Sequence, residues 1–133
     1  MLFEENNKAI YIQIADRICD EIVNGTYPPD SRLPSVREYA ADMQVNANTV
    51  MRSYERLAQR GHIYNRRGIG FFVAPDARRR ILDERGSDLV DNRLDNIFSL
   101  LHHLGIDPDT LRDAYAAYLQ RSSAECNNSI NSL

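Results

Sequence analysis

Three amphipathic helical patterns and one hairpin pattern follow each other within residues 8–75, and this order limits the folds that the chain can adopt. The first helical pattern covers residues 8–24. Isoleucine recurs there every fourth residue, which places four side chains on one face of an α-helix: Ile10, Ile14, Ile18 and Ile22. Gly25 ends this helix, and the Pro28-Pro29 pair predicts an extended, turn-rich connection after it.

Two further helices are predicted from their caps and apolar faces. The second begins after Pro34, where Ser35 can cap the backbone while Glu38 reaches back to it in a capping box. Its apolar face consists of Val36, Tyr39, Ala40 and Met43. The third helix has Asn46 or Asn48 as its N-cap. Its inward-facing residues are Val50, Tyr54 and Leu57.

The third helix is followed by residues that alternate around two glycines. Residues 63–73 predict two short β-runs joined at a tip that contains Gly68, and Pro75 closes this unit. The order helix, helix, helix and hairpin is typical of a winged helix-turn-helix. The sequence therefore predicts a mainly α fold with a small β-hairpin, in which residues 8–75 form a winged helix-turn-helix domain.

Charge is distributed unevenly along the chain. The whole chain has a net charge of -3, which by itself argues against nucleic acid as a partner. Residues 31–72, however, contain seven arginines and three acidic residues, whereas residues 76–133 contain seven arginines and ten acidic residues. The basic region coincides with the last two helices and the hairpin of the predicted domain. A local basic footprint of this kind favours contact with DNA.

The predicted third helix has the properties of a helix that enters the major groove. Its inner face is apolar, while Asn48, Thr49 and Arg52 face outward and can contact phosphates or base edges. In the hairpin, Arg66 and Arg67 precede a glycine that permits close backbone approach, so the wing can lie along a minor groove. The alternative is a winged-helix protein-interaction module that has no operator, with the arginines forming an ordinary solvated face.

Several separated motifs resemble the DNA-binding domain of GntR-type transcription regulators. They are YIQI, the NG that ends the first helix, LPSVRE, NTV, SYERLAQRG and RRGIGFFV, and the resemblance covers residues 8–74. It implies that Arg37 contacts the operator, that Thr49 contacts phosphate and that Gly68 approaches the minor groove. Many members have Ser-Arg where this chain has Asn46-Ala47, so base reading here is expected to fall to Asn48 or Arg52. The DNA-binding candidates are Ser35, Arg37, Asn46, Asn48, Thr49, Arg52, Arg66, Arg67 and Gly68.

The remainder of the chain predicts a short helical dimerisation segment. Residues 76–104 have a helical period that Gly86 could interrupt, and a second helix begins at Pro108 with Asp107 as its N-cap. Residues 76–121 are assigned to this segment, and the polar residues 122–133 to a disordered tail. Two helices do not enclose an effector pocket, and whether a small-molecule effector exists is left open.

This short tail resembles that of the YtrA-like branch, which implies a homodimer that acts by operator occupancy, most often as a repressor. The expected dimer interface is Leu94, Ile97, Phe98, Leu101, Leu104, Leu111, Tyr115 and Tyr118. The alternative is that these helices fold back on the DNA-binding domain of their own chain.

Enzymatic, metal and membrane functions find no support in the sequence. His62, at the end of the third helix, and the adjacent pair His102-His103 form no catalytic constellation. Neighbouring residues on a helix point about 100° apart, so the pair makes a poor metal site and a surface location is expected for it. Cys19 is expected to be a small core residue, and its separation from Cys126 argues against a disulfide. We therefore expect no enzyme activity, no metal and no cofactor. Without a signal peptide or a long apolar run, a cytoplasmic location with no membrane partner is expected.

Overall fold

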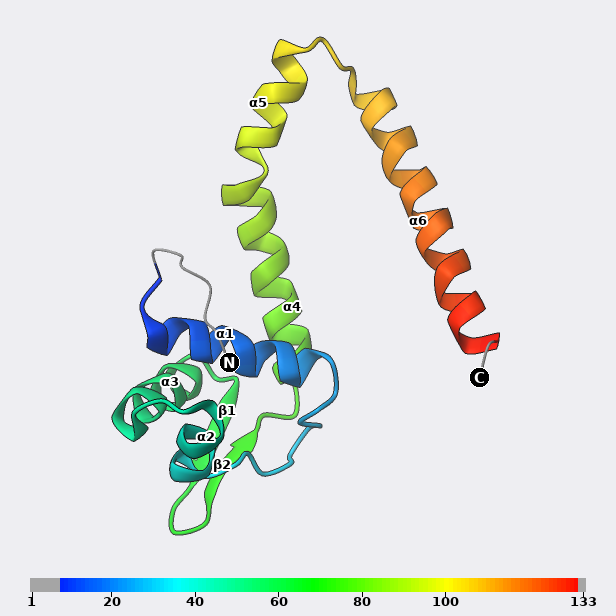
Figure 1. Cartoon of the computed structure of the whole chain (residues 1–133). Helices are drawn as coiled ribbons and strands as arrows, with labels where there is room; N and C mark the ends of the chain where they lie inside the picture. Colours follow the sequence, from blue (N-terminus) through cyan, green and yellow to red (C-terminus); the bar gives the residue numbers. More distant parts are fainter. Residues whose placement is uncertain (1–7, 132–133) are drawn as a thin grey trace. The chain divides into compact units, whose positions relative to one another are not determined.

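The structure is a computed structural model that describes the backbone of residues 8–131 and the side chains of residues 8–124 (Figure 1). It falls into two compact units, which divide between Ser87 and Asp88. The mainly helical architecture and the two-stranded hairpin agree with the fold class that the sequence predicts.

The first unit contains the three predicted helices, α1 (Ile10–Val23), α2 (Val36–Met43) and α3 (Ala47–Gln59). The isoleucine stripe of α1 is buried at Ile14, Ile18 and Ile22, as the four-residue spacing predicts. Ile10 is the exception, because this first residue of the helix is 52% exposed. The core-facing part of α1 is therefore one turn shorter than its sequence pattern.

Both predicted N-caps are formed by side chains close in sequence. The Ser35 hydroxyl accepts a hydrogen bond from the backbone N–H of Glu38 at 3.1 Å, and so begins α2. At the start of α3, the side-chain oxygen of Asn46 accepts from the backbone N–H of Asn48 at 2.8 Å. Of the two asparagines that the sequence offered as caps, the structure thus uses the first.

The wing is an antiparallel hairpin of β1 (Ile63–Arg66) and β2 (Gly70–Val73). A third extended segment that the sequence analysis missed lies beside it, because Arg32 forms a β-bridge with Phe72. On either side of this bridge, Leu33 N–H donates to the Phe71 carbonyl and Val73 N–H to the Ser31 carbonyl, both at 2.9 Å. The turn-rich connection after α1 therefore ends as an edge of the wing sheet.

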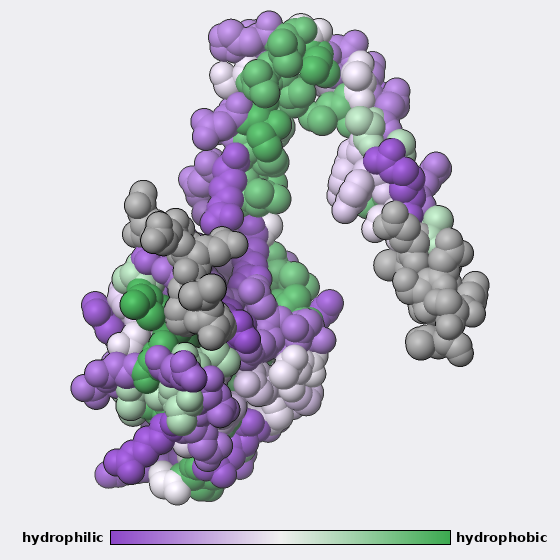
Figure 2. Space-filling model, in the orientation of Figure 1, coloured by the Kyte–Doolittle hydropathy of each residue, from purple (hydrophilic) through white to green (hydrophobic). Residues whose placement is uncertain are grey.

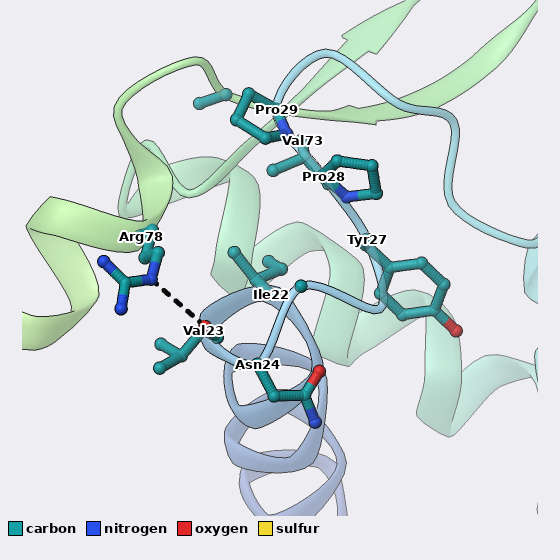
Figure 3. Close-up of a pocket in the computed structure, with 10 residues that line it drawn as sticks. Ile22, Val23, Asn24, Tyr27, Pro28, Pro29, Val73 and Arg78 are labelled. Carbon is teal, nitrogen blue, oxygen red and sulfur yellow. Dashed lines mark hydrogen bonds between the residues drawn. The ribbon is translucent and has the colours of Figure 1, made fainter. Parts of the chain in front are cut away.

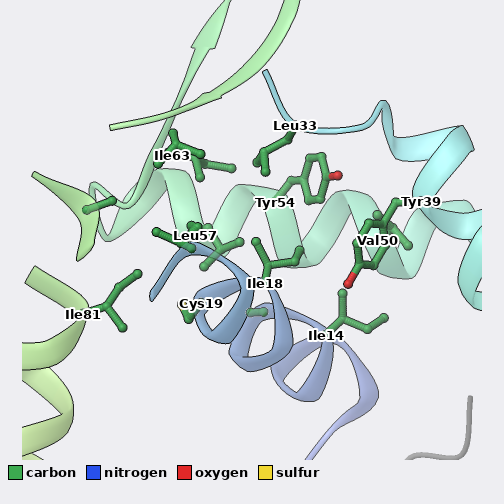
Figure 4. Close-up of a cluster of buried hydrophobic side chains, with 14 of the residues drawn as sticks. Ile14, Ile18, Cys19, Leu33, Tyr39, Val50, Tyr54, Leu57, Ile63 and Ile81 are labelled. Atoms are coloured by element: carbon green, nitrogen blue, oxygen red, sulfur yellow. The ribbon is translucent and has the colours of Figure 1, made fainter. Parts of the chain in front are cut away.

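The core of the first unit lies where α1, α2, α3 and the wing meet (Figure 4). Tyr54 of α3 is fully buried, with its ring 6.2 Å from that of Tyr39 on α2 and 5.2 Å from that of Phe71 on β2. Its hydroxyl donates a hydrogen bond to the Pro34 carbonyl at 2.7 Å. One side chain therefore joins α3 to both α2 and the wing.

Helix α4 (Ala77–Asp88) belongs to the first unit up to Ser87 and packs on the winged helix through its first turns. Ala77 and Ile81 are buried in the core, and Arg85 forms a 2.6 Å ion pair with Asp20 of α1. The domain boundary predicted from the sequence lies after Pro75. The structure moves it to Ser87, because α4 adds its own apolar face and arginines to the first unit.

His62 is buried at the junction of α3, β1 and α4, which its place at the end of a helix in the sequence did not indicate. Its Nε2 lies 2.8 Å from a carboxylate oxygen of Glu84, and its Nδ1 lies 3.8 Å from the thiol of Cys19. Cys19 is a buried core residue, as expected, and burial raises the pKa of its thiol to about 11. A protonated thiol can donate to Nδ1, which leaves the imidazole proton on Nε2 to face the carboxylate.

The stability of the first unit is expected to fall in mild acid because of His62. Burial lowers the pKa of this imidazole below its ordinary value of 6.5, and the opposing attraction of Glu84 does not restore it. The unfolded chain then binds a proton that the folded chain excludes, so the free energy of unfolding decreases as the pH falls below 6.5. Denaturant unfolding of the wild type and of His62→Gln at pH 7.5 and 5.5, where carboxylates stay ionised, measures this effect. Equal losses in the two proteins would show that His62 is not the cause.

The second unit consists of helical segments with little burial of their own. The π-helical segment η1 (Leu89–Arg93) precedes α5 (Asp95–His103) and α6 (Pro108–Asn131). The irregularity lies at 89–94 rather than at Gly86, which continues α4 without a break. Asp107 caps α6 as predicted, since its side chain accepts from the Thr110 N–H at 2.8 Å.

The disordered tail that the sequence analysis expected from residue 122 is not present over 122–131. Helix α6 continues to Asn131, because no proline or glycine follows Pro108 to break it. The side chain of Cys126 and all of residues 132–133 lie outside the described residues. No described helix is long and apolar enough to cross a membrane.

Candidate nucleic-acid interface

Helix α3 presents a polar outer face that is held rigidly by the core. Val50, Tyr54 and Leu57 are buried on one side, while Asn48 and Arg52 are exposed on the other. Thr49 is half-buried beside them. A helix with this division can enter a major groove without disturbing its own packing.

Two of the predicted site residues shape the backbone at the helix starts. Ser35 and Asn46 each direct a side-chain oxygen to the first turn of their own helix. Their local role is therefore capping, which orients the N-termini of α2 and α3. Arg37 is the second residue of α2 and is exposed just beyond the first of these caps. Helix N-termini attract phosphate through their unpaired N–H groups and the helix dipole.

The wing brings Arg66 against two aromatic rings. The rings of Tyr64 and Phe72 stack at 5.7 Å, and the Arg66 guanidinium lies 5.2 Å from the centre of the Phe72 ring. Arg67 and Gly68 are exposed in the turn between the strands. Gly68 has a φ of 80° with no atom near the position of an added Cβ, so the tip has room for close backbone approach.

The arginines of this surface lack carboxylate partners, whereas several arginines elsewhere have them. Arg17, Arg60 and Arg85 all form ion pairs with carboxylates. No ion pair in the described part of the chain involves the six arginines carried by the wing sheet, α2 and α3, namely Arg32, Arg37, Arg52, Arg56, Arg66 and Arg67. Their positive charge is thus available to an external anion.

Arg32 and Arg56 belong to this set although the sequence analysis did not place them among the site residues. Arg32 lies on the wing edge because of the β-bridge to Phe72, and its Nε is 3.2 Å from where a Cβ on Gly70 would lie. The only sign of these two residues in the sequence was the number of arginines over residues 31–72. The sequence did not predict the third extended segment, so it gave no reason to place Arg32 beside the hairpin.

A small apolar hollow of about 340 Å³ lies between the end of α1, the Tyr27–Pro29 loop and the base of the wing (Figure 3). Arg78 lies at its edge, but its Nε donates to the Val23 carbonyl at 3.1 Å. Across the described residues, no group of His, Cys, Asp and Glu side chains is arranged to hold a metal ion. The hollow offers no acid, base or nucleophile directed into it.

Comparison with known proteins identifies this fold. The family model for bacterial regulatory proteins of the gntR family matches residues 10–73. The HTH-type transcriptional regulator YhcF of Bacillus subtilis is 33% identical over 116 residues, which span 87% of this chain and 94% of that protein. The chain belongs to the GntR family. It is therefore a DNA-binding transcription regulator with a winged helix-turn-helix, and the family is not one of enzymes.

Two further comparisons place this GntR regulator among the small, YtrA-like members. The HTH-type transcriptional repressor YtrA of Bacillus subtilis is 28% identical over 104 residues, which cover 78% of this chain and 79% of that protein. A GntR-family regulator from Bacteroides thetaiotaomicron, known from its crystal structure, has 48% sequence identity to this chain. The two structures superpose with a TM-score of 0.76, and the match covers 86% of this chain and 99% of the Bacteroides chain.

The winged helix of this GntR regulator is also similar to that of the AraR DNA-binding domain, whose crystal structure is a complex with operator ORR3. The AraR domain has 28% sequence identity to this chain and a TM-score of 0.50. The match covers 56% of this chain and 89% of the AraR chain in that structure. The likeness is thus to the DNA-binding part of AraR.

Proposed function

We propose that this GntR regulator represses transcription by occupying operator DNA as a homodimer. The observation that carries the proposal is the set of six arginines without ion pairs on α2, α3 and the wing sheet. In this arrangement α3 enters a major groove, while Arg66, Arg67 and Gly68 of the wing follow the adjacent minor groove. Arg37 and the capped N-termini of α2 and α3 contact the phosphate backbone and the base edges beside it. The operator complex of AraR and the name of YtrA as a repressor support this assignment.

The homodimer is supported by the second unit. Over residues 88–124 no side chain is buried, although this stretch has many apolar residues (Figure 2). Ile97 and Phe98 on α5, with Tyr115 and Tyr118 on α6, are between 44% and 62% exposed. Leu94 and Leu101 are partly covered, and Leu104 and Leu111 are exposed.

Apolar surface of this extent is typical of a subunit interface. A second copy of the chain would cover it and would place two recognition helices on two half-sites.

A binding titration tests the proposal directly. The protein is titrated against the DNA upstream of its own gene and against a scrambled duplex, each at two salt concentrations. If about six phosphates are neutralised, affinity should fall by about 10³ between about 50 and about 200 mM salt. Tight, selective and salt-dependent binding is the expected result. Weak binding that is equal on both duplexes over a range of upstream fragments would contradict the proposal and favour a protein-interaction module.

Replacement of Arg37 by alanine should weaken operator binding by about 1–3 kcal/mol, because a bidentate arginine contact with a base has that magnitude. Arg37 is exposed on α2, so folding should be unaffected. Arg79→Ala on α4 is the matched control, since it removes an exposed arginine that pairs with Asp76. Titration of the operator with a folded Arg37→Ala protein measures the effect. An affinity equal to that of the control variant would remove this role from Arg37.

A further inference from the structure

Arg52 of the recognition helix is seated on an aromatic ring from another helix. The carbon at the centre of its guanidinium lies 4.0 Å from the ring centroid of Tyr11, near the start of α1. At this distance the planar guanidinium is attracted by the electron-rich face of the ring and can stack on it. Arg52 is nevertheless exposed and makes no ion pair with any described residue. The donors at the edge of its guanidinium therefore remain available.

The position of Tyr11 is itself fixed by the recognition helix. The fully buried hydroxyl of Ser53, the residue after Arg52, donates to the Tyr11 backbone carbonyl at 2.7 Å. The same hydroxyl lies 3.1 Å from the Thr49 carbonyl within α3. Ser53 thus joins the two backbones beside the stacked pair and fixes the start of the Tyr11 side chain against the helix that carries Arg52.

Arg52 also lies on the outer face of α3, away from the core. It follows the buried Val50 by two residues, which at about 100° per residue turns it to nearly the opposite side of the helix. Asn48 lies one turn earlier on the same face. When a helix of this kind lies in a major groove, this face is the one directed at the bases. Ala47, nearer the helix start, has no polar group with which to read a base.

We propose that Arg52 reads a guanine in the major groove and that Tyr11 is the residue that positions it. This inference rests on the proposed operator binding and names the side chain that gives it base selectivity. Arginine recognises guanine through paired hydrogen bonds to O6 and N7. A flexible arginine loses conformational freedom on making such a contact, and stacking on a fixed ring reduces that loss before DNA arrives. Tyr11 thus acts on selectivity through Arg52, without touching the DNA bases.

The test is selection of binding sites from a randomised duplex library by five folded proteins and one control variant. They are the wild type, Arg52→Ala, Tyr11→Leu, Tyr11→Phe and the double variant Tyr11→Leu with Arg52→Ala. Arg56→Ala is the matched control, because Arg56 is a second arginine of α3 that has no ion pair and no aromatic contact among the described residues. Thermal unfolding of each protein shows that it is folded, and titration of the wild-type site measures affinity.

Arg52→Ala should lose the preference for one G·C pair in each half-site, with affinity reduced by about 5- to 150-fold. Tyr11→Leu should weaken the same preference, by about two- to fivefold, because it removes the ring but not the arginine. Tyr11→Phe should behave as the wild type, since it keeps the aromatic face. In the Arg52→Ala background, Tyr11→Leu should have no further effect. Arg56→Ala should lower affinity without changing any preferred base.

Two results would overturn the inference. Uniform weakening by Arg52→Ala, with every base preference kept, would make Arg52 a phosphate contact. A Tyr11→Leu effect that persists in the Arg52→Ala background would show that Tyr11 acts independently of the arginine. A wild-type protein that selects no sequence at all would instead defeat the proposed operator binding, and this inference with it. Because that outcome is seen in the wild type and the others only in variants, the two failures are distinguishable.

Discussion

Replacing Ile97 and Leu101 together by aspartate should convert the protein to monomers and reduce operator affinity by about 10²–10⁴-fold, the usual gain from engaging two sites at once. The two residues lie one turn apart on α5, so their side chains share a face. Ile97 is 52% exposed within the single chain and is expected to be covered in the dimer. Two carboxylates at such a contact would have to be desolvated and would repel those of the other subunit.

Light scattering and an operator titration check this prediction. The control is Ser99→Asp with His102→Asp, which adds the same two negative charges to the opposite side of α5. The control protein should stay dimeric and keep its affinity. A dimer that persists in the Ile97 and Leu101 variant would place the interface elsewhere. A wild type that is monomeric would favour helices that fold back on their own DNA-binding domain.

Replacing Tyr54 by alanine should lower the free energy of unfolding by about 3–5 kcal/mol, as large aromatic-to-alanine changes in cores do. The ring is fully buried and contacts both Tyr39 and Phe71, so its removal leaves a cavity between α2, α3 and β2. The hydrogen bond from its hydroxyl to the Pro34 carbonyl is lost as well. A loss of this size is a large fraction of the stability of a small domain, and operator binding should fail with folding.

Urea denaturation at neutral pH measures the effect, and two variants separate its parts. Tyr54→Phe keeps the ring contacts and loses only the hydroxyl, so it should cost about 0.5–1.5 kcal/mol. Glu55→Ala, at the exposed neighbouring position, should change stability by less than about 0.5 kcal/mol. If Tyr54→Ala were as stable as Glu55→Ala, the ring would not be the element that joins α2 and the wing to α3.

The local features of the fold were predictable because the interactions that form them lie within one helical turn. Ser35 caps a backbone N–H three residues on, Asn46 caps one two residues on, and Asp107 caps α6 in the same manner. The buried side chains of α3 follow a helical period that is visible in the letters alone. The resemblance to GntR regulators rested on these same short motifs, and the family model matches nearly the same residues.

The features that the sequence analysis missed depend on residues far apart in the chain. His62 is buried because Cys19 and Glu84 meet it from 43 and 22 residues away. The end of the first unit moved past Pro75 because Ile81 fits into a core built mainly by earlier helices. None of these contacts has a period or a spacing that a single sequence displays.

The order of the elements, the inner face of α3 and the concentration of arginine over residues 31–72 can be read from the amino-acid sequence. The surroundings of those arginines depend on how the elements pack. This packing pairs Arg60 with Glu84 from α4, leaves Arg37 without an acidic partner and seats Arg52 on Tyr11. The physical reason is that helix periods and caps arise between neighbours in the chain. Whether a surface arginine has a partner, by contrast, depends on which carboxylates and aromatic rings the packing of distant elements brings within a few ångströms of it.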